Sequence, residues 1–228
     1  MKKLLTLVLT ILSFTVYSQE LKFEKPNYNK IEKEIEKKSS SYYYEKLKEK
    51  FNSSDSTMTL EEKRHLYYGF SFKKEYSSSY HNKANDSLMN ILNKEDYSTD
   101  DFKKIIEFGN QILSENPFDL RVLNYQLYAY EKMQEKDNYM KKLTQFTIIV
   151  DAILSSGDGT SKENAIYVIN VSHEYDILNI IGFEFGGSQS LIAGQYDYLK
   201  VKENKFKIDG LYFDISPSIK NIENMFKD

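Results

Sequence analysis

Hydrophobic residues recur every three or four positions through most of the segment between residues 29 and 154, with Glu and Lys filling the positions between them. This spacing puts the apolar side chains on one face of a helix. It predicts amphipathic helices over residues 29–51 (interrupted by serines at 39–41), 59–68, 83–93, 99–116, 119–134 and 138–154. Residues 70–81 are rich in serine and aromatic residues, so we expect them to be irregular.

The expected helix ends carry their own signals. Thr59 followed three residues later by Glu62 fits a capping box. Ser98 or Thr99 can cap the helix that follows them, and the acidic residues just after them suit the positive end of the helix dipole. Asn116 precedes a proline, which disfavours the helical conformation and ends that helix.

The pattern changes after residues 155–161, where two glycines flank an aspartate in a run of small polar residues. Beyond this point the hydrophobic period moves toward two. We expect strands at 165–171, 183–185, 189–193, 196–202 and 211–215, and short helices at 173–181 and 218–226. The predicted fold class is α+β, with a helical region (19–155) followed by a small α+β region (156–228) whose sheet is mainly antiparallel.

The first eighteen residues predict a signal peptide. Lys2 and Lys3 precede an uncharged apolar run over residues 4–16, which is too short to cross a bilayer. Val16 and Ser18 suit the positions before a cleavage site, so we expect the mature chain to begin at Gln19. An uncleaved anchor is the less favoured alternative. The chain is therefore expected to be exported, to the periplasm or the cell surface.

Composition excludes several classes of function. The absence of cysteine rules out disulfides, thiol catalysis and cysteine-ligated zinc. The 31 basic and 34 acidic residues are interspersed, which argues against a basic face for nucleic acid. No apolar stretch after the signal peptide is long enough to predict a transmembrane segment in the mature chain. The 19 tyrosines suit a modest core with amphipathic edges, or an aromatic binding surface.

Two resemblances to known families follow from these patterns. The expected hairpins between residues 99 and 154 resemble degenerate tetratricopeptide units, although most of the signature positions of that repeat are missing. Several short motifs together resemble a family of exported bacterial proteins known as domain of unknown function 4919. They are Tyr67-Tyr68-Gly69-Phe70, Asn116-Pro117, Gly157-Asp158-Gly159-Thr160, His173-Glu174-Tyr175, Gln189-Ser190-Leu191, Tyr196-Asp197-Tyr198 and Tyr212-Phe213-Asp214. This resemblance implies no activity and no catalytic residue.

No established catalytic or cofactor motif is present, whether a P-loop, a dinucleotide glycine motif, a nucleophile elbow or a zinc-binding HExxH. The loop around Asp158 lacks the alternating acidic ligands of a calcium-binding loop. The three histidines, His65, His81 and His173, are scattered along the chain and none has a histidine partner at helical spacing. We therefore expect neither a cofactor nor a bound metal.

Two stretches stand out as candidate binding residues. The aromatic block that includes Tyr67, Tyr68 and Phe70 can stack on a sugar or a peptide, but packing beneath an irregular loop is the favoured interpretation. In the second stretch, His173 and Asp176 lie three apart, so they share a face if the segment is helical, and Glu174 stands beside them. Acidic groups in a first helical turn are also explained by the helix dipole, and a structural role is favoured for this stretch.

These observations lead to two hypotheses. The first is a non-enzymatic binding module of the cell envelope, whose partner is an envelope protein or a glycan. The second is a hydrolase that uses acidic and histidine residues of the C-terminal part. The two differ in whether the candidate side chains converge on one cleft; these are Asp158, His173, Glu174, Asp176, Asp197 and Asp214.

Overall fold

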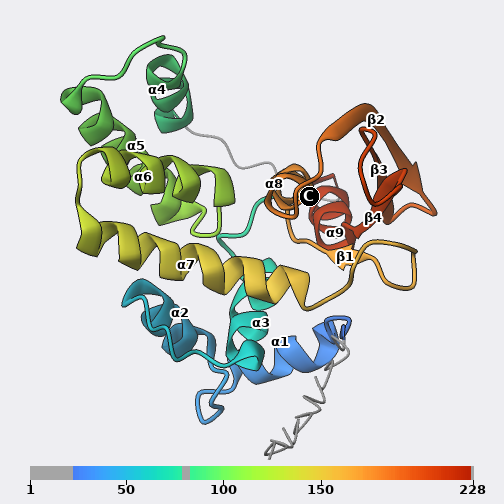
Figure 1. Cartoon of the computed structure of the whole chain (residues 1–228). Helices are drawn as coiled ribbons and strands as arrows, with labels where there is room; N and C mark the ends of the chain where they lie inside the picture. The colour runs from blue at the N-terminus through green and yellow to red at the C-terminus, as the bar shows by residue number, and fades with distance from the viewer. Residues whose placement is uncertain (1–22, 79–82, 227–228) are drawn as a thin grey trace, which may run out of the picture.

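The computed structural model describes residues 23–78 and 83–226, so the predicted signal peptide, His81 and Tyr80, an aromatic residue of the segment expected to be irregular, lie outside the described part. The N-terminal half is helical, and a small sheet with two short helices follows it (Figure 1). The first elements are α1 (Tyr28–Glu36), α2 (Tyr44–Asn52), α3 (Leu60–Gly69), a 3₁₀ turn η1 (Phe70–Phe72), α4 (Lys83–Leu92), α5 (Thr99–Glu115), α6 (Leu120–Lys132) and α7 (Lys136–Leu154). The remaining elements are β1 (Ile166–Tyr167), α8 (Ser172–Ile180), β2 (Phe185–Ile192), β3 (Tyr196–Val201), β4 (Gly210–Asp214) and α9 (Ser216–Met225).

Side-chain caps set the starts of the central helices. Thr59 and Glu62 form the predicted capping box at α3, and Ser98 forms a second one with Asp101 at α5. The Asp119 side chain accepts a hydrogen bond from the third residue of α6. The predicted helix over 29–51 is two helices, because residues 37–43 around the serines form turns between α1 and α2.

The sheet has four strands in the order β1-β4-β3-β2 within the described part of the chain. The predicted hairpin of β3 and β4 is confirmed, and β2 pairs antiparallel with β3. The sheet is mixed, since β1 pairs parallel with β4 and spans two residues where a longer strand was expected. In place of the expected strands 183–185 and 189–193 the chain forms a single edge strand, β2, which includes Phe185 but not the two residues before it. This strand is irregular between Phe185 and Gln189, where Gly187 adopts a φ of 84°.

One hydrophobic cluster joins the helical region to the α+β region. It extends from Ile31 in α1 through the helices to Phe213 and Ile215 beside the sheet. The connection between the regions is itself tightly packed, because a Cβ atom added to Gly157 would lie 2.2 Å from the carbonyl oxygen of Ala165. The two regions therefore share a core, and the α+β fold class is confirmed.

Helices α4 to α7 pack in sequence order, and α4, α5 and α6 enclose a second, smaller hydrophobic cluster. Their tetratricopeptide-like character is not established by this packing and stays a prediction. Across residues 23–78 and 83–226, no helix combines the length and the apolar composition needed to cross a membrane.

Candidate functional site

Helix α8 carries the stretch that the sequence singled out. It begins at Ser172, contacts α6, and ends where Gly182 turns the chain with a φ of 84°. Successive residues of a helix point about 100° apart. His173, Glu174 and Asp176 consequently enter three different surroundings, and each is described in turn.

His173 is fully buried and bonds to Tyr67 of α3. The Tyr67 hydroxyl accepts a hydrogen bond from the Ile169 amide at 3.1 Å and donates its own hydrogen to Nδ1 of His173 at 2.7 Å. This arrangement assigns the ring hydrogen to Nε2, which has no hydrogen-bond partner. Burial lowers the pKa of His173 to about 4. The Phe118 backbone opposes this shift, although it forms no well-aligned hydrogen bond to Nε2. The imidazole is therefore neutral at pH 7.

Glu174 faces the sheet and meets a second carboxyl group, that of Asp197 in β3. Both residues are buried, and the amide nitrogen of Gln189 donates hydrogen bonds to both, at 3.3 Å to Glu174 and 2.5 Å to Asp197. The Tyr175 hydroxyl donates to the amide oxygen of the same glutamine. Burial raises the pKa of Glu174 to about 9, and the neighbouring Asp197 adds to the shift, so Glu174 is protonated at neutral pH.

Asp176 points toward α6 and pairs with Arg121. Two guanidinium nitrogens donate to the same carboxylate oxygen, Oδ1, at 3.2 and 3.3 Å. The other oxygen, Oδ2, is buried without a partner. Burial raises the pKa of Asp176, an effect that Arg121 opposes and the nearby Asp119 reinforces. This part of the site therefore holds the carboxyl groups of Asp176 and Asp119 and the guanidinium of Arg121. The Oδ2 atom of Asp176 can still accept a hydrogen bond.

A groove runs along the exposed face of α6. It consists of three adjoining hollows of about 410, 450 and 370 Å³, in which the first and second share Asn124 and Tyr125 and the second and third share Glu131 and Tyr139. Arg121 and Asp176 line its first hollow. Five of the α6 residues that line it lie three or four apart and form one stripe: Arg121, Asn124, Tyr125, Tyr128 and Glu131. Leu120, Leu127 and Tyr130 of the same helix also line the hollows. Helix α6 lies between α5 and α7, and α8 lies beyond one of its ends (Figure 1).

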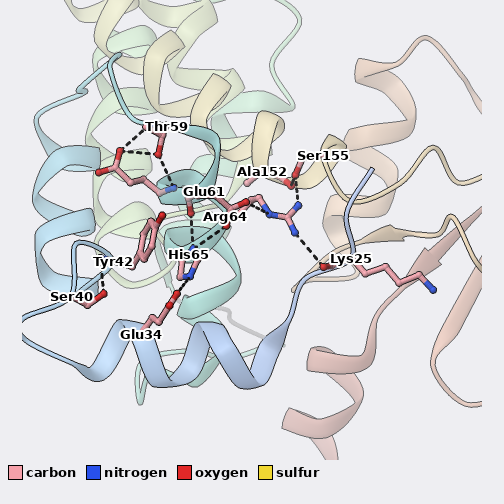
Figure 2. A network of polar contacts seen from close by, with 11 residues as sticks. Lys25, Glu34, Ser40, Tyr42, Thr59, Glu61, Arg64, His65, Ala152 and Ser155 are labelled. Carbon is pink, nitrogen blue, oxygen red and sulfur yellow. Dashed lines mark hydrogen bonds and ion pairs between the residues drawn. The ribbon is translucent and has the colours of Figure 1, made fainter. Parts of the chain in front are cut away.

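A second polar network surrounds α3, far from the C-terminal candidates in sequence (Figure 2). Its centre is His65, whose Nδ1 donates to the Glu61 carbonyl at 2.7 Å and whose Nε2 contacts the Glu34 carboxylate at 2.7 Å. The Tyr42 ring stacks on the imidazole with centroids 4.1 Å apart. Because His65 is 1% exposed, its ring ties α1 to α3 and is not accessible to a ligand.

Arg64, the neighbour of His65, extends the same network toward the α+β region (Figure 2). Its guanidinium donates to the Ser155 hydroxyl at 2.7 Å and to the Lys25 carbonyl at 3.3 Å, and it pairs with Glu61. Sequence reasoning did not identify Arg64 or Arg121. The Arg121 partner, Asp176, lies on another helix, and of the Arg64 partners only Glu61 lies at helical spacing, so no local pattern indicates the bonds to Ser155 and Lys25. Tyr128 and the stripe of α6 were detectable from helical spacing but were assigned no role.

The aromatic candidates lie inside the protein. Tyr67, Tyr68 and Phe70 are at most 5% exposed and pack with Phe118 and Tyr76 in the main hydrophobic cluster. The hydroxyl groups of Tyr67 and Tyr68 bond to backbone or to buried side chains, as the Tyr68 hydroxyl does with the Ala152 carbonyl. A ligand cannot stack on these rings in this conformation.

The acidic candidates of the C-terminal part do not line one cleft. Asp158 accepts hydrogen bonds from Thr160 within its own turn, and Asp214 accepts them from Ser216 at the start of α9. Asp176 alone among the six candidate residues lines one of the hollows described above. Residues 23–78 and 83–226 contain no cluster of three or more His, Asp or Glu side chains positioned to hold a metal ion.

Comparison with known proteins gives one match. No curated protein and no solved structure matches the chain. The sequence model of one family, described as Domain of unknown function (DUF4919), matches residues 29–224, which is most of the chain and includes every residue of the groove and of the network around α8. The chain therefore belongs to the DUF4919 family.

Proposed function

We propose that the chain is a non-enzymatic binding module of the cell envelope, which takes an extended segment of a partner protein in the groove along α6. The observation that carries this proposal is the stripe of Arg121, Asn124, Tyr125, Tyr128 and Glu131 over three adjoining hollows. Tyrosine and arginine are the residues that most often supply binding energy in protein interfaces.

The dimensions of the groove suit a short extended segment. The ten-residue advance from Arg121 to Glu131 corresponds to about 15 Å along the helix axis. An extended chain advances about 3.3 Å per residue, so roughly five residues of a partner span the stripe. Tyr128 is 42% exposed and supplies an aromatic surface near the middle of the stripe. The exposed guanidinium of Arg121 and the side chain of Asn124 provide polar groups for the backbone of the segment.

The separation of the acidic residues supports a binding role over the hydrolase alternative. Acid–base catalysis needs its groups within hydrogen-bonding reach of a substrate. Glu174 and Asp197 form the one close carboxyl pair described above, but both are buried beneath Gln189. His173 is enclosed between α3 and α8 and is 0% exposed. Location in the envelope is proposed from the basic, apolar and cleavage pattern of the first eighteen residues.

Site-specific photocrosslinking in the producing cell tests the proposed groove. A photoreactive amino acid at position 128 should crosslink a single partner protein, whereas the same amino acid at position 206 should not, because Phe206 is exposed on a different part of the molecule. A segment of the identified partner should then bind the purified chain. Tyr128→Ala and Arg121→Ala should each weaken binding about tenfold or more, and Phe206→Ala should not.

Other outcomes separate the alternatives. If the partner segment binds equally well to the Tyr128→Ala variant, the groove is not the site. If no protein is crosslinked and a purified envelope glycan binds with the same dependence on Tyr128, the groove is the site but the partner class is wrong. The intact mass of chain purified from the envelope should correspond to a start at Gln19; a species that retains residues 1–18 contradicts the proposed processing.

A further inference from the structure

Glu174 and Asp197 place two carboxyl groups together inside the protein without a cation beside them. Glu174 is 0% exposed and Asp197 is 5% exposed. None of the ion pairs among the described residues includes either group. Two buried carboxylates repel each other, so the pair must either take up a proton or bind a positive charge.

The side chain of Gln189 bridges the two carboxyl groups. The amide nitrogen of Gln189 lies 2.5 Å from Asp197 Oδ2 and 3.3 Å from Glu174 Oε2. The second oxygen of Glu174, Oε1, is buried and has no hydrogen-bond partner. A half-turn of the Gln189 amide brings its oxygen to the position of its nitrogen. That rotation gathers oxygens of Glu174, Asp197 and Gln189 around a common centre.

We propose that Glu174, Asp197 and Gln189 form a binding site for a calcium ion. Glu174 binds through both of its oxygens, which gives Oε1 a partner, and Asp197 and Gln189 each supply one oxygen. Water fills the remaining positions from the solvent side, because Gln189 is exposed and lies on the edge strand β2. The ion links α8 to the β2–β3 hairpin and supplies the positive charge that the two adjacent carboxyl groups lack.

The donor set selects calcium among the common cations. Calcium accepts six to eight oxygen ligands at 2.3–2.6 Å in flexible geometry, whereas magnesium requires a near-ideal octahedron at 2.0–2.1 Å. The site offers no nitrogen or sulfur ligand for zinc. With two carboxylates and water completing the shell, the affinity should be in the range of extracellular calcium modules, about 10⁻⁴ to 10⁻³ M. This inference does not depend on the groove along α6.

Thermal unfolding of the full mature chain tests the site. Addition of 10 mM calcium chloride to protein prepared in EDTA should raise the unfolding midpoint by about 4 °C, and the same concentration of magnesium should raise it much less. Terbium provides a direct probe. The chain has no tryptophan, and the Tyr175 hydroxyl bonds to Gln189, so terbium in the site should luminesce on excitation of tyrosine and calcium should displace it.

Three variants make the test specific. Glu174→Gln keeps the shape and hydrogen-bonding capacity of the side chain, so it should fold yet lose both the calcium shift and the terbium signal. Gln189→Glu adds a third carboxylate and should tighten calcium binding at least tenfold. Glu184→Gln is the control, since Glu184 lies one residue before β2 but is exposed and pairs with Lys202, and the variant should show the same calcium shift and terbium signal as the unmodified chain. The proposal is overturned if calcium has no effect, or if its effect persists unchanged in Glu174→Gln.

Discussion

The hydroxyl of Tyr67 donates a hydrogen bond of 2.7 Å to Nδ1 of His173, and these two buried residues lie 106 positions apart in the chain. The bond joins α3 of the helical region to α8 of the α+β region. The same hydroxyl accepts from the amide of Ile169, so one oxygen satisfies two groups that have no access to water. Loss of that oxygen leaves a buried donor and a buried acceptor without partners.

Tyr67→Phe is therefore expected to destabilise the fold by about 1–3 kcal/mol, the usual cost of unsatisfied buried polar groups. Urea denaturation followed by far-ultraviolet circular dichroism measures this loss. Tyr128→Phe is the control, because the Tyr128 ring is 42% exposed and its hydroxyl can bond to water. Equal stability of the Tyr67→Phe variant and the unmodified chain would show that the bond contributes little to folding.

The pH dependence of stability should report the buried His173. The pKa of the ring is about 4 in the folded chain, below its ordinary value of 6.5, because burial disfavours the charged form. Between pH 4 and pH 6.5, therefore, the His173 side chain is protonated in the unfolded chain and neutral in the folded chain. The contribution of the neutral ring is complete above pH 6.5 and is lost as the pH falls toward 4, by up to about 3 kcal/mol.

His173→Gln isolates this effect because glutamine does not titrate. The variant is expected to be less stable than the unmodified chain at pH 7, and the difference between the two should shrink as the pH falls from 6.5 to 4.5. Urea midpoints at four pH values across this range give the comparison. A difference that stays constant with pH would mean that His173 is protonated in the folded state as readily as in the unfolded one.

In EDTA, which removes calcium, Glu174 should give stability the opposite pH dependence, so that its contribution is lost as the pH rises. Its pKa is about 9 in the folded chain and 4.5 ordinarily, so the folded chain holds the proton more tightly. The resulting stabilisation is complete below pH 4.5 and is lost as the pH rises through 9. Glu174→Gln has no proton to lose and should be more stable than the unmodified chain at pH 8 by at least about 1 kcal/mol. A variant that is less stable at pH 8 contradicts this account.

Local sequence features were sufficient to predict most of the elements. The capping box of Thr59 and Glu62, the spacing of apolar residues in α5 to α7, and the alternation in β3 and β4 all act within a few residues, and the structure contains each of them. Strand β1 was predicted too long because an apolar run from 165 to 171 does not distinguish a strand from buried irregular chain. Two of its residues pair with β4, and the remainder is buried except for Val171, which is partly buried.

The partners of the candidate site residues could not be predicted, because they lie on other elements and no local sequence pattern indicates such contacts. His173 and Asp176 were expected to meet if the segment was helical, and the segment is helical, but their nearest polar partners are Tyr67 and Arg121 on other helices. Spacing within one helix decides which residues share a face and says nothing of what that face meets. The pairing of Glu174 with Asp197 similarly depends on how the β2–β3 hairpin lies against α8.

Gly109 in α5 tests how closely α5 and α6 approach each other. A Cβ atom at this position would lie 2.7 Å from the amide nitrogen of Gln126, which is 0% exposed and donates to the Ile106 carbonyl and to Asn110. Alanine favours a helix over glycine by about 1 kcal/mol. The steric conflict with a fixed, hydrogen-bonded side chain should outweigh this gain, so we expect Gly109→Ala to destabilise the fold by about 1–2 kcal/mol net.

A double-mutant cycle separates the steric effect from helix propensity. Gln126→Ala removes the atoms that an alanine at position 109 would meet. In that background Gly109→Ala should be neutral or stabilising, because only the propensity gain remains. Urea denaturation of the four proteins gives the coupling energy between positions 109 and 126. If Gly109→Ala costs the same in both backgrounds, its effect does not arise from Gln126, and the close approach of α5 and α6 at this point is not what requires glycine.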